Sequence, residues 1–328
     1  MRNNSILVIA PVFGEYHKVI SSTIRRSSNY SKVLFIPEAP LYNLGVFAFV
    51  SKLFPFLRSL LIKIHNWLIC YCIKRYDIKT LFIIRGEFID TRKLGLIKEE
   101  RPCIKIISYQ WDSIKNNPNA KSLIGVSDSS YTFDFNDSEN YRMNYLPLFY
   151  CWDEFGYQNL DEKKAPKRVD FFFVGGYRTS RVPILREFKE FCVKNGFTYY
   201  FKSFERLGSY LLNRKKLNME KKDISFSQLS YKDYFYRLDA SRYVIDIQSP
   251  TQTGLTMRTM EALSLQKKLI TTNGFIKKTP LYSDSMVYVL DDINDINTSK
   301  FRHFLGSRNH KIEALLSLTN WLKKLDIL

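Results

Sequence analysis

Residues 242–272 contain the pattern that most restricts the fold of this chain. It consists of a short apolar strand at 242–247, a polar turn that contains a glycine, a helix that reaches about Gln266, and a second apolar strand at 268–272. Strands joined through a helix in this way run parallel in one sheet, because a parallel pair needs a long crossover connection. The pattern therefore predicts an α/β protein.

The same alternation covers both halves of the chain. Strand patterns are found at 5–10, 32–36, 80–84, 103–109, 127–133, 145–149, 169–175, 197–202, 224–226 and 286–290, and helix patterns at 16–25, 47–76 (interrupted by Pro55), 179–195, 231–240 and 308–324. A polar, charged connection at 151–168 separates two such series. A chain of 328 residues is long enough for two domains. We predict a first domain at 1–155, a second at 166–305 and a terminal segment at 306–328.

The turn after residue 247 has the chemistry of an anion site. Amides at a helix N-terminus point outward and can bind a phosphate. One turn further into the helix, Arg258 and Glu261 are three residues apart and share a face. The arginine could neutralise a diphosphate, and the carboxylate could accept both hydroxyls of a ribose. The alternative is a solvent-exposed Arg258–Glu261 pair after a tight turn.

A second loop of this kind follows the apolar strand at 169–175. It contains Gly175 and Gly176, then Tyr177, and two arginines, Arg178 and Arg181, at the start of a helix. Glycines allow the backbone to approach a ligand, and either arginine could neutralise a diphosphate. The alternative is a tight turn with solvated arginines.

Ligands of open parallel sheets bind beyond the carboxyl ends of the strands, which directs attention to five further loops. These loops carry Gly14 and Glu15, Arg85 and Glu87, Trp111 and Asp112, Asp134, and Gln248. Trp111 could stack on a sugar, and Asp112 could hold sugar hydroxyls or take the proton of an acceptor. The alternative places Trp111 in the core and Asp112 at a helix N-cap.

The segment Gly254-Leu255-Thr256 followed by Glu261 resembles the donor-binding region of glycosyltransferases with the GT-B fold. The resemblance is strongest from about 169 to 290. It implies two Rossmann-like domains that face a central cleft, with a terminal helix that crosses back to the first domain. It also implies a nucleotide-sugar donor, a retaining reaction, and neither a metal nor another cofactor. Many such families carry a second glutamate earlier in the motif, where this chain has Gln252, Thr253 or Gly254, and this departure weakens the inference of retention.

The resemblance and the loops together give three sets of predicted site residues. The catalytic residues would be Asp112 and Arg178; the donor-binding residues would be Gly176, Tyr177, Arg178, Arg181, Gln248, Thr253, Gly254, Leu255, Thr256, Arg258 and Glu261; the acceptor-binding residues would be Gly14, Glu15, Glu87 and Trp111.

The formal net charge of +18 indicates an anionic partner. The resemblance implies a sugar nucleotide as donor and a saccharide or lipid-diphosphate-linked saccharide as acceptor, in the assembly of bacterial lipopolysaccharide, O-antigen or capsule. No nucleic-acid-binding signature is present, so we do not expect a nucleic acid partner. Two alternatives remain: a non-enzymatic binder of nucleic acid or anionic membrane, and a transferase of Kdo or a phosphopolyol from a CMP- or CDP-linked donor.

We expect a cytoplasmic protein, because the five cysteines form no disulfide framework and the chain opens on a strand pattern instead of a signal peptide. The apolar region at 45–76 carries interspersed basic residues, which makes it a poor membrane span. It is either a core-packed helix pair or a basic face that lies on the anionic inner leaflet.

Overall fold

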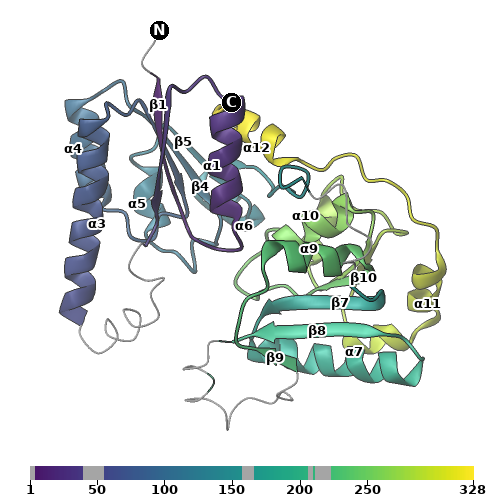
Figure 1. Cartoon of the computed structure of the whole chain (residues 1–328). Helices are drawn as coiled ribbons and strands as arrows, with labels where there is room; N and C mark the ends of the chain where they lie inside the picture. Colours follow the sequence, from purple (N-terminus) through teal and green to yellow (C-terminus); the bar gives the residue numbers. More distant parts are fainter. Residues whose placement is uncertain (1–3, 40–54, 157–165, 206–209, 211–222) are drawn as a thin grey trace. The chain divides into compact units, whose positions relative to one another are not determined.

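The structure, a computed structural model, describes residues 4–39, 55–156, 166–205, 210 and 223–328. The chain forms two compact units. The first unit comprises Met1–Leu148, Pro250–Gly254 and Ser317–Leu328, and the second comprises Phe149–Ser249 and Leu255–Leu316. Each unit contains a six-stranded parallel sheet with helices (Figure 1). Residues 47–54, the first part of the helix pattern predicted at 47–76, lie outside the described residues.

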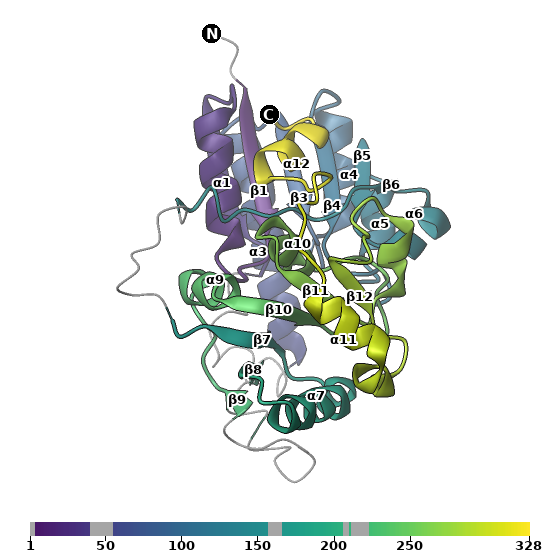
Figure 2. The same ribbon diagram turned by 90° about the vertical axis from the view of Figure 1, so that its right-hand side faces the viewer.

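In the first unit the strand order is β2-β1-β3-β4-β5-β6. Its elements are β1 (Ser5–Ala10), α1 (Tyr16–Ser27), β2 (Lys32–Pro37), α3 (Pro55–Arg75), β3 (Thr80–Ile84), α4 (Thr91–Glu100), β4 (Lys105–Gln110), α5 (Ala120–Ile124), β5 (Ser129–Thr132), α6 (Phe135–Tyr141), β6 (Asn144–Tyr145) and α12 (Leu318–Lys324). Every residue of β1 and β3 is buried. Their near-continuous apolar sequences suit central strands of a parallel sheet that is covered on both faces. Helices α3 and α4 lie on one face, and α1 and α12 lie on the other (Figures 1 and 2).

Helix α12 brings the end of the chain into the core of the first unit. Trp321 is fully buried, and its ring lies edge-on to Tyr109 with the centroids 4.7 Å apart. Phe82 packs at 6.0 Å on the same indole. The Trp321 side chain therefore fastens α12 over β3 and β4.

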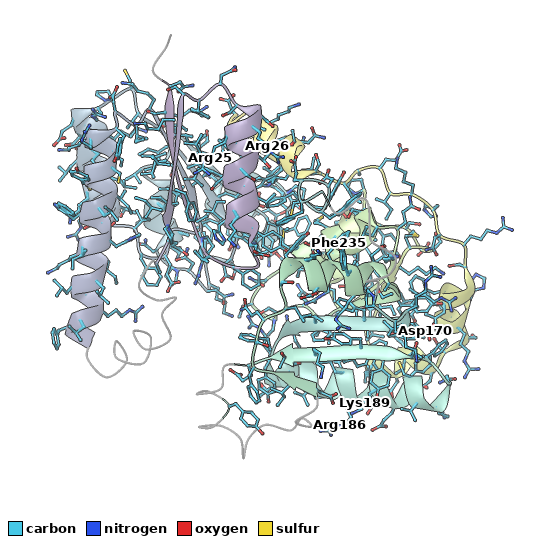
Figure 3. The ribbon with its side chains drawn as sticks, viewed as in Figure 1. Arg25, Arg26, Asp170, Arg186, Lys189 and Phe235 are labelled. Atoms are coloured by element: carbon cyan, nitrogen blue, oxygen red, sulfur yellow. The ribbon has the colours of Figure 1, made fainter. Side chains whose placement is uncertain are left out.

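In the second unit the strand order is β12-β11-β10-β7-β8-β9. Its elements are β7 (Val169–Gly176), the 3₁₀ helix η2 (Thr179–Arg181), α7 (Val182–Lys194), β8 (Tyr199–Phe204), β9 (Ile224–Ser225), α9 (Tyr231–Asp239), β10 (Ser241–Asp246), α10 (Met257–Ser264), β11 (Lys268–Thr271), η5 (Gly274–Lys278), β12 (Val287–Val289), η6 (Ile293–Asn297) and α11 (Ser299–Gly306). The core is rich in aromatic rings. Phe171 of β7 packs on Phe191 of α7 and Tyr243 of β10, with centroid distances of 6.1 and 4.8 Å. Phe235 of α9 is also buried, and it is labelled in Figure 3.

Most predicted elements are present, with ends that differ by a few residues. The strand predicted at 145–149 is wrong, because β6 covers only Asn144–Tyr145. The helix predicted at 308–324 begins only at Leu318, where Ser317 caps it by accepting from the Asn320 amide. Helices α4, α5, α6 and α11 have no counterpart in the prediction. They are short segments of 5 to 10 residues, too brief to give a periodic signal.

Replacing the buried indole tests how much the terminal helix contributes to stability. Trp321→Ala should lower the free energy of unfolding by about 3–5 kcal/mol, because it leaves a large cavity against Tyr109 and Phe82. Urea unfolding followed by circular dichroism would measure the change. Val193→Ala, at a position that is 68% exposed, is the matched control and should change it by less than about 0.5 kcal/mol. Equal stability of the two variants would contradict the packing role of α12.

Candidate functional site

The central group of the second unit is Asp246, the last residue of β10. Its side chain is buried and accepts hydrogen bonds from the Thr256 and Thr259 hydroxyls, both at 2.8 Å. Arg258 Nη1 donates to the other carboxylate oxygen at 2.7 Å. One carboxylate thus fixes the first turn of α10 to the end of the neighbouring strand. Thr256 is also the N-cap of α10, since its hydroxyl accepts from the Thr259 amide.

Two guanidinium groups meet at the carboxyl ends of β7 and β10. Arg258 also donates to the Val174 carbonyl and lies 4.9 Å from the centroid of the Phe173 ring. Arg181 donates to the Ile247 carbonyl through Nε at 3.2 Å and Nη2 at 3.0 Å. Burial, and next the charge of Arg258, lower the pKa of Arg181 to about 10. With Asp246 as the buried carboxylate between them, the two arginines leave this site with a net positive charge.

Gly175 makes the approach of both arginines to the β7 loop sterically feasible. A Cβ at this position would lie 2.9 Å from Arg258 Nη2 and 3.3 Å from Arg181 Nη1. A Cβ at Gly176, the glycine that the sequence suggested, would meet nothing within 4 Å. The glycine that the arginines require is therefore the first of the pair.

Two other predicted residues of this loop lie beside the arginine pair. Tyr177 is anchored through its amide, which donates to the Phe204 carbonyl at 2.8 Å. Arg178 is exposed, and its charge contributes to lowering the pKa of Arg181. Three cationic side chains are thus grouped beyond the end of β7. Such an arrangement is suited to a doubly or triply charged anion.

Glu261 is buried one turn further along α10. Its side chain is 1% exposed, and Tyr231 of α9 donates to Oε1 at 2.8 Å. Burial and then the charge of Glu261 raise the pKa of Tyr234, which hydrogen-bonds to the same carboxylate. Since Arg258 is also largely buried, the alternative of a solvent-exposed Arg258–Glu261 pair is wrong. The role of Glu261 toward a ribose stays a prediction, and a ribose would have to share the carboxylate with Tyr231.

The remaining predicted donor residues divide between the two units. Leu255 is buried, and the Gln248 amide donates to the Thr272 hydroxyl at 2.9 Å, both within the second unit. Thr253 and Gly254 belong to the first unit. The sequence did not predict that the loop between β10 and α10 would be divided between the two units.

In the first unit, Asp134 occupies the amides that the sequence assigned to a diphosphate. Its carboxylate accepts from the Thr253 amide at 2.6 Å, the Thr253 hydroxyl at 2.7 Å and the Gly254 amide at 3.2 Å. A Cβ at Gly254 would lie 2.5 Å from the Phe133 carbonyl oxygen, so only glycine fits there. These two amides do not stand open in this structure, and an anion would have to displace the carboxylate.

The loops after β2 and β3 form a second charged group in the first unit. Glu38, which is 2% exposed, accepts from the Glu87 amide at 2.6 Å, and its Oε2 lies 3.7 Å from Arg85 Nη1. Arg85 also pairs with the Glu87 carboxylate. Burial raises the pKa of Glu38 from its ordinary value of 4.5 to about 7, against the opposing charge of Arg85.

The loops after β1 and β3 each contain a non-glycine residue with left-handed backbone next to a glycine. Arg85 has φ 70° beside Gly86, and Glu15 has φ 64° beside Gly14. A side chain larger than glycine in this region costs about 1–2 kcal/mol. Such conformations are found preferentially where a ligand is bound, so the two loops are candidate binding elements.

Aromatic rings lie beside these loops. Tyr16 packs on Trp111 with centroids 5.6 Å apart and on Phe13 at 6.2 Å. Phe13 is 56% exposed, which gives the group an accessible ring of the type that stacks on sugars. The Asp112 carboxylate accepts from the Ser113 amide at 3.0 Å, from Asn116 Nδ2 at 2.8 Å and from Gln252. Asp112 therefore stabilises its own loop, but it caps no helix, because α5 begins only at Ala120. Its catalytic role stays a prediction.

Sequence reasoning missed Asp246 and Glu38, and it nominated Arg85 and Asp134 only by their places after strands, without including them in a predicted set of site residues. An aspartate inside the apolar pattern at 242–247 was the available signal for Asp246, because a charge in a buried strand needs a partner. Glu38 follows β2 directly and could have been nominated as Arg85 was, from its place after a strand. Within the described ranges, no group of three or more His, Cys, Asp or Glu could hold a metal ion. Metal independence nevertheless remains a prediction.

Comparison with known proteins identifies the fold. No protein-family model matches the sequence, and a search of curated proteins found no match either. The chain is similar to the UDP-GlcNAc 2-epimerase of Methanocaldococcus jannaschii, with TM-score 0.61, 9% identity, and coverage of 98% of this chain and 99% of that one. An α-glucosyltransferase solved with UDP and DNA gives TM-score 0.54 and 13% identity over 92% and 89% of the two chains. Spinosyn rhamnosyltransferase with thymidine diphosphate gives 0.50 and 8% over 98% and 100%.

At these identities the likeness establishes the architecture. The chain has the α/β GT-B fold, with two parallel six-stranded sheets, and the sequence prediction of this fold class is confirmed. The three neighbours named above are two glycosyltransferases and a UDP-GlcNAc 2-epimerase. The predicted domain bounds and the central cleft stay predictions.

Removing the charge of Asp246 tests its role in fixing α10. Asp246→Asn should lower the free energy of unfolding by about 3–5 kcal/mol, because it leaves the Arg258 guanidinium without its buried counter-ion. Chemical denaturation would measure the change. Asp291→Asn, which removes an exposed carboxylate 3.7 Å from Lys277, should cost less than about 1 kcal/mol. A loss for Asp246→Asn no greater than that of the control would refute the structural role.

Glu38 makes a specific prediction for the pH dependence of stability. Because the folded protein holds this proton more tightly than the unfolded chain, the contribution is present below pH 4.5 and is lost as pH rises through 7. The stability of wild type relative to Glu38→Gln should fall by about 3 kcal/mol across that window, at 1.36 kcal/mol per unit of pKa. Denaturation titrations between pH 4.5 and 8 would measure it. Glu100→Gln at the surface should retain the wild-type slope, and parallel curves for wild type and Glu38→Gln would contradict the burial of a protonated carboxyl.

Proposed function

We propose that this protein is a glycosyltransferase that binds its nucleotide-sugar donor in the second unit. The observation that carries the proposal is the group formed by Arg178, Arg181 and Arg258 at the carboxyl ends of β7 and β10. Diphosphate is the anion whose charge and extent match three converging cations. The GT-B fold, shared with enzymes solved with UDP or thymidine diphosphate, supports the same assignment.

The arginines suit the chemistry of glycosyl transfer. In this reaction the bond between the anomeric carbon and the diphosphate oxygen breaks, and a bond to an acceptor oxygen forms as the acceptor hydroxyl loses its proton. Negative charge develops on the departing diphosphate, and preorganised cations stabilise it most in the transition state. Arg178 and Arg181 would supply that charge without a metal, and Glu261 would hold the ribose. Retention of anomeric configuration is part of the proposal.

The acceptor side of the proposal rests on the first unit. An exposed aromatic ring at Phe13, the charged Glu38–Arg85–Glu87 group and the two left-handed loops suit a polyhydroxylated acceptor such as a saccharide or lipid-diphosphate-linked saccharide. Asp112 would take the acceptor proton. We place this activity in bacterial surface glycan assembly, in the cytoplasm at the inner face of the cell membrane.

A second candidate is a sugar-nucleotide epimerase, because several structural neighbours are UDP-GlcNAc 2-epimerases that match along almost the whole chain. Incubation with UDP-GlcNAc separates the two reactions. A transferase releases UDP when an acceptor is supplied, whereas an epimerase converts the sugar nucleotide to its 2-epimer without one.

Nucleotide binding is the most direct test of the donor site. UDP, GDP, CDP, CMP and dTDP should be compared by thermal shift, where the cognate nucleotide at 100-fold over its Kd should stabilise by about 2.7 kcal/mol. Arg178→Ala should weaken that binding by about tenfold, since a hydrogen bond to a charged group is worth about 1.5–3 kcal/mol. Arg178 is exposed, so this substitution should leave the fold intact.

Arg186→Ala on α7 provides the matched control, an exposed arginine further along the same part of the chain (Figure 3). It should bind nucleotide like wild type. Stabilisation by CMP or CDP alone would favour a Kdo or phosphopolyol transferase. Stabilisation by none of the nucleotides, with steeply salt-dependent binding of any polyanion, would replace the enzyme with a non-enzymatic binder.

A further inference from the structure

Helix α3 exposes a row of large apolar side chains on its outer face. The row, which we call the outer stripe, consists of Phe56, Leu60, Ile64, Trp67 and Tyr71, each between 47% and 66% exposed. Spacings of four, four, three and four residues place them along one side of the helix. The outer face of a surface helix is ordinarily polar. A continuous apolar row in that place indicates a surface that meets a non-aqueous partner.

The opposite face of α3 is fixed to the first unit. Asn66 Nδ2 donates to the Phe88 carbonyl at 2.8 Å, and its Oδ1 accepts from the Asp90 amide at 2.7 Å. Ile69 and Ile73 are buried in the core of the unit. Burial lowers the pKa of His65 to about 4, so this buried side chain is uncharged at neutral pH.

These contacts limit the ways in which α3 can contact a bilayer. Among the helices of the described residues, the one at Phe56–Arg75 alone has the length and apolar composition to cross a membrane. Its inner face is nevertheless committed to the protein core. Only the outer stripe is available to lipid, which suits a helix that lies along a membrane surface.

The charges that border the outer stripe indicate which kind of surface the stripe binds. Lys63 is four residues before Trp67, and Lys74 and Arg75 are three and four residues after Tyr71, so all three border the stripe. Lys74 also pairs with Glu100 at 2.7 Å, an exposed contact that contributes little. Helix α3 contains no aspartate or glutamate. A second copy would bring the same cations together, whereas an anionic surface complements them and the net charge of +18.

We propose that the outer stripe is a docking surface for an anionic lipid bilayer. The helix lies parallel to the membrane plane, and its apolar side chains enter the boundary between headgroups and acyl chains. Trp67 and Tyr71, whose rings stack with centroids 5.5 Å apart, occupy the interfacial layer that Trp and Tyr prefer. The flanking lysines and arginine contact lipid phosphates.

Flotation of the full-length protein with vesicles tests the proposal. Wild type should bind phosphatidylcholine vesicles that contain about one third phosphatidylglycerol, and should not bind phosphatidylcholine alone, because an exposed cation gains about 1 kcal/mol at an anionic surface. The double variant Trp67→Ser/Tyr71→Ser should bind at least tenfold more weakly. Lys63→Gln/Arg75→Gln should bind about 25-fold more weakly, at about fivefold for each charge.

Val193→Ser on α7, at a position that is 68% exposed, is the control for loss of an exposed apolar side chain and should bind like wild type. Leu60→Gln/Ile64→Gln alters the same face without touching the aromatic rings and should also reduce binding. Absence of wild-type binding to anionic vesicles, or unchanged binding by both stripe variants, would overturn the proposal. So would a wild-type dimer in sedimentation equilibrium that the stripe variants dissociate, because a second copy would then cover this face.

Discussion

The buried carboxylate of Asp246 is the interaction on which the second unit depends. A carboxylate in a protein interior is unfavourable unless donors surround it, and here two threonine hydroxyls and a guanidinium do so. The same contacts fix the start of α10 and hold Arg258 against Phe173. The position of Arg258, one of the three arginines of the cationic group, therefore follows from the solvation of one charge at the end of a strand.

The fold was accessible from the sequence because both of its sheets are parallel. Strands such as β1 and β3 are buried on both faces, and their apolar runs differ clearly from the helices between them. The short helices α4, α5, α6 and α11 were not predicted, because one to three turns carry too few apolar positions for a period to emerge. The end of the chain was harder to predict. The helix there covers only Leu318–Lys324, the short segment whose Trp321 packs on Tyr109.

The candidate site was accessible only in outline. Arg178, Arg181 and Arg258 were predicted as phosphate ligands from their places after strands, and the structure groups them. Their fixing partners were not predicted, since Asp246, Val174 and Ile247 contribute a carboxylate and two backbone carbonyls that no local pattern reveals. Asp134 shows the limit most clearly. Its bonds to Thr253 and Gly254 join positions more than a hundred residues apart, which periodicity within a short window cannot detect.

At position 85 the backbone conformation and the charge of the side chain favour different residues. The left-handed backbone favours glycine, whereas the neighbouring acidic groups favour a cation. Glycine would adopt this conformation without steric cost, and a folding chain would be the more stable for it. Glycine would also remove the guanidinium that pairs with Glu38 and Glu87, whose charge opposes the rise in the pKa of Glu38 that burial causes. Arg85 thus supplies the counter-charge to both acidic groups from a left-handed backbone, and a search for stabilising substitutions in this protein should leave residue 85 unchanged.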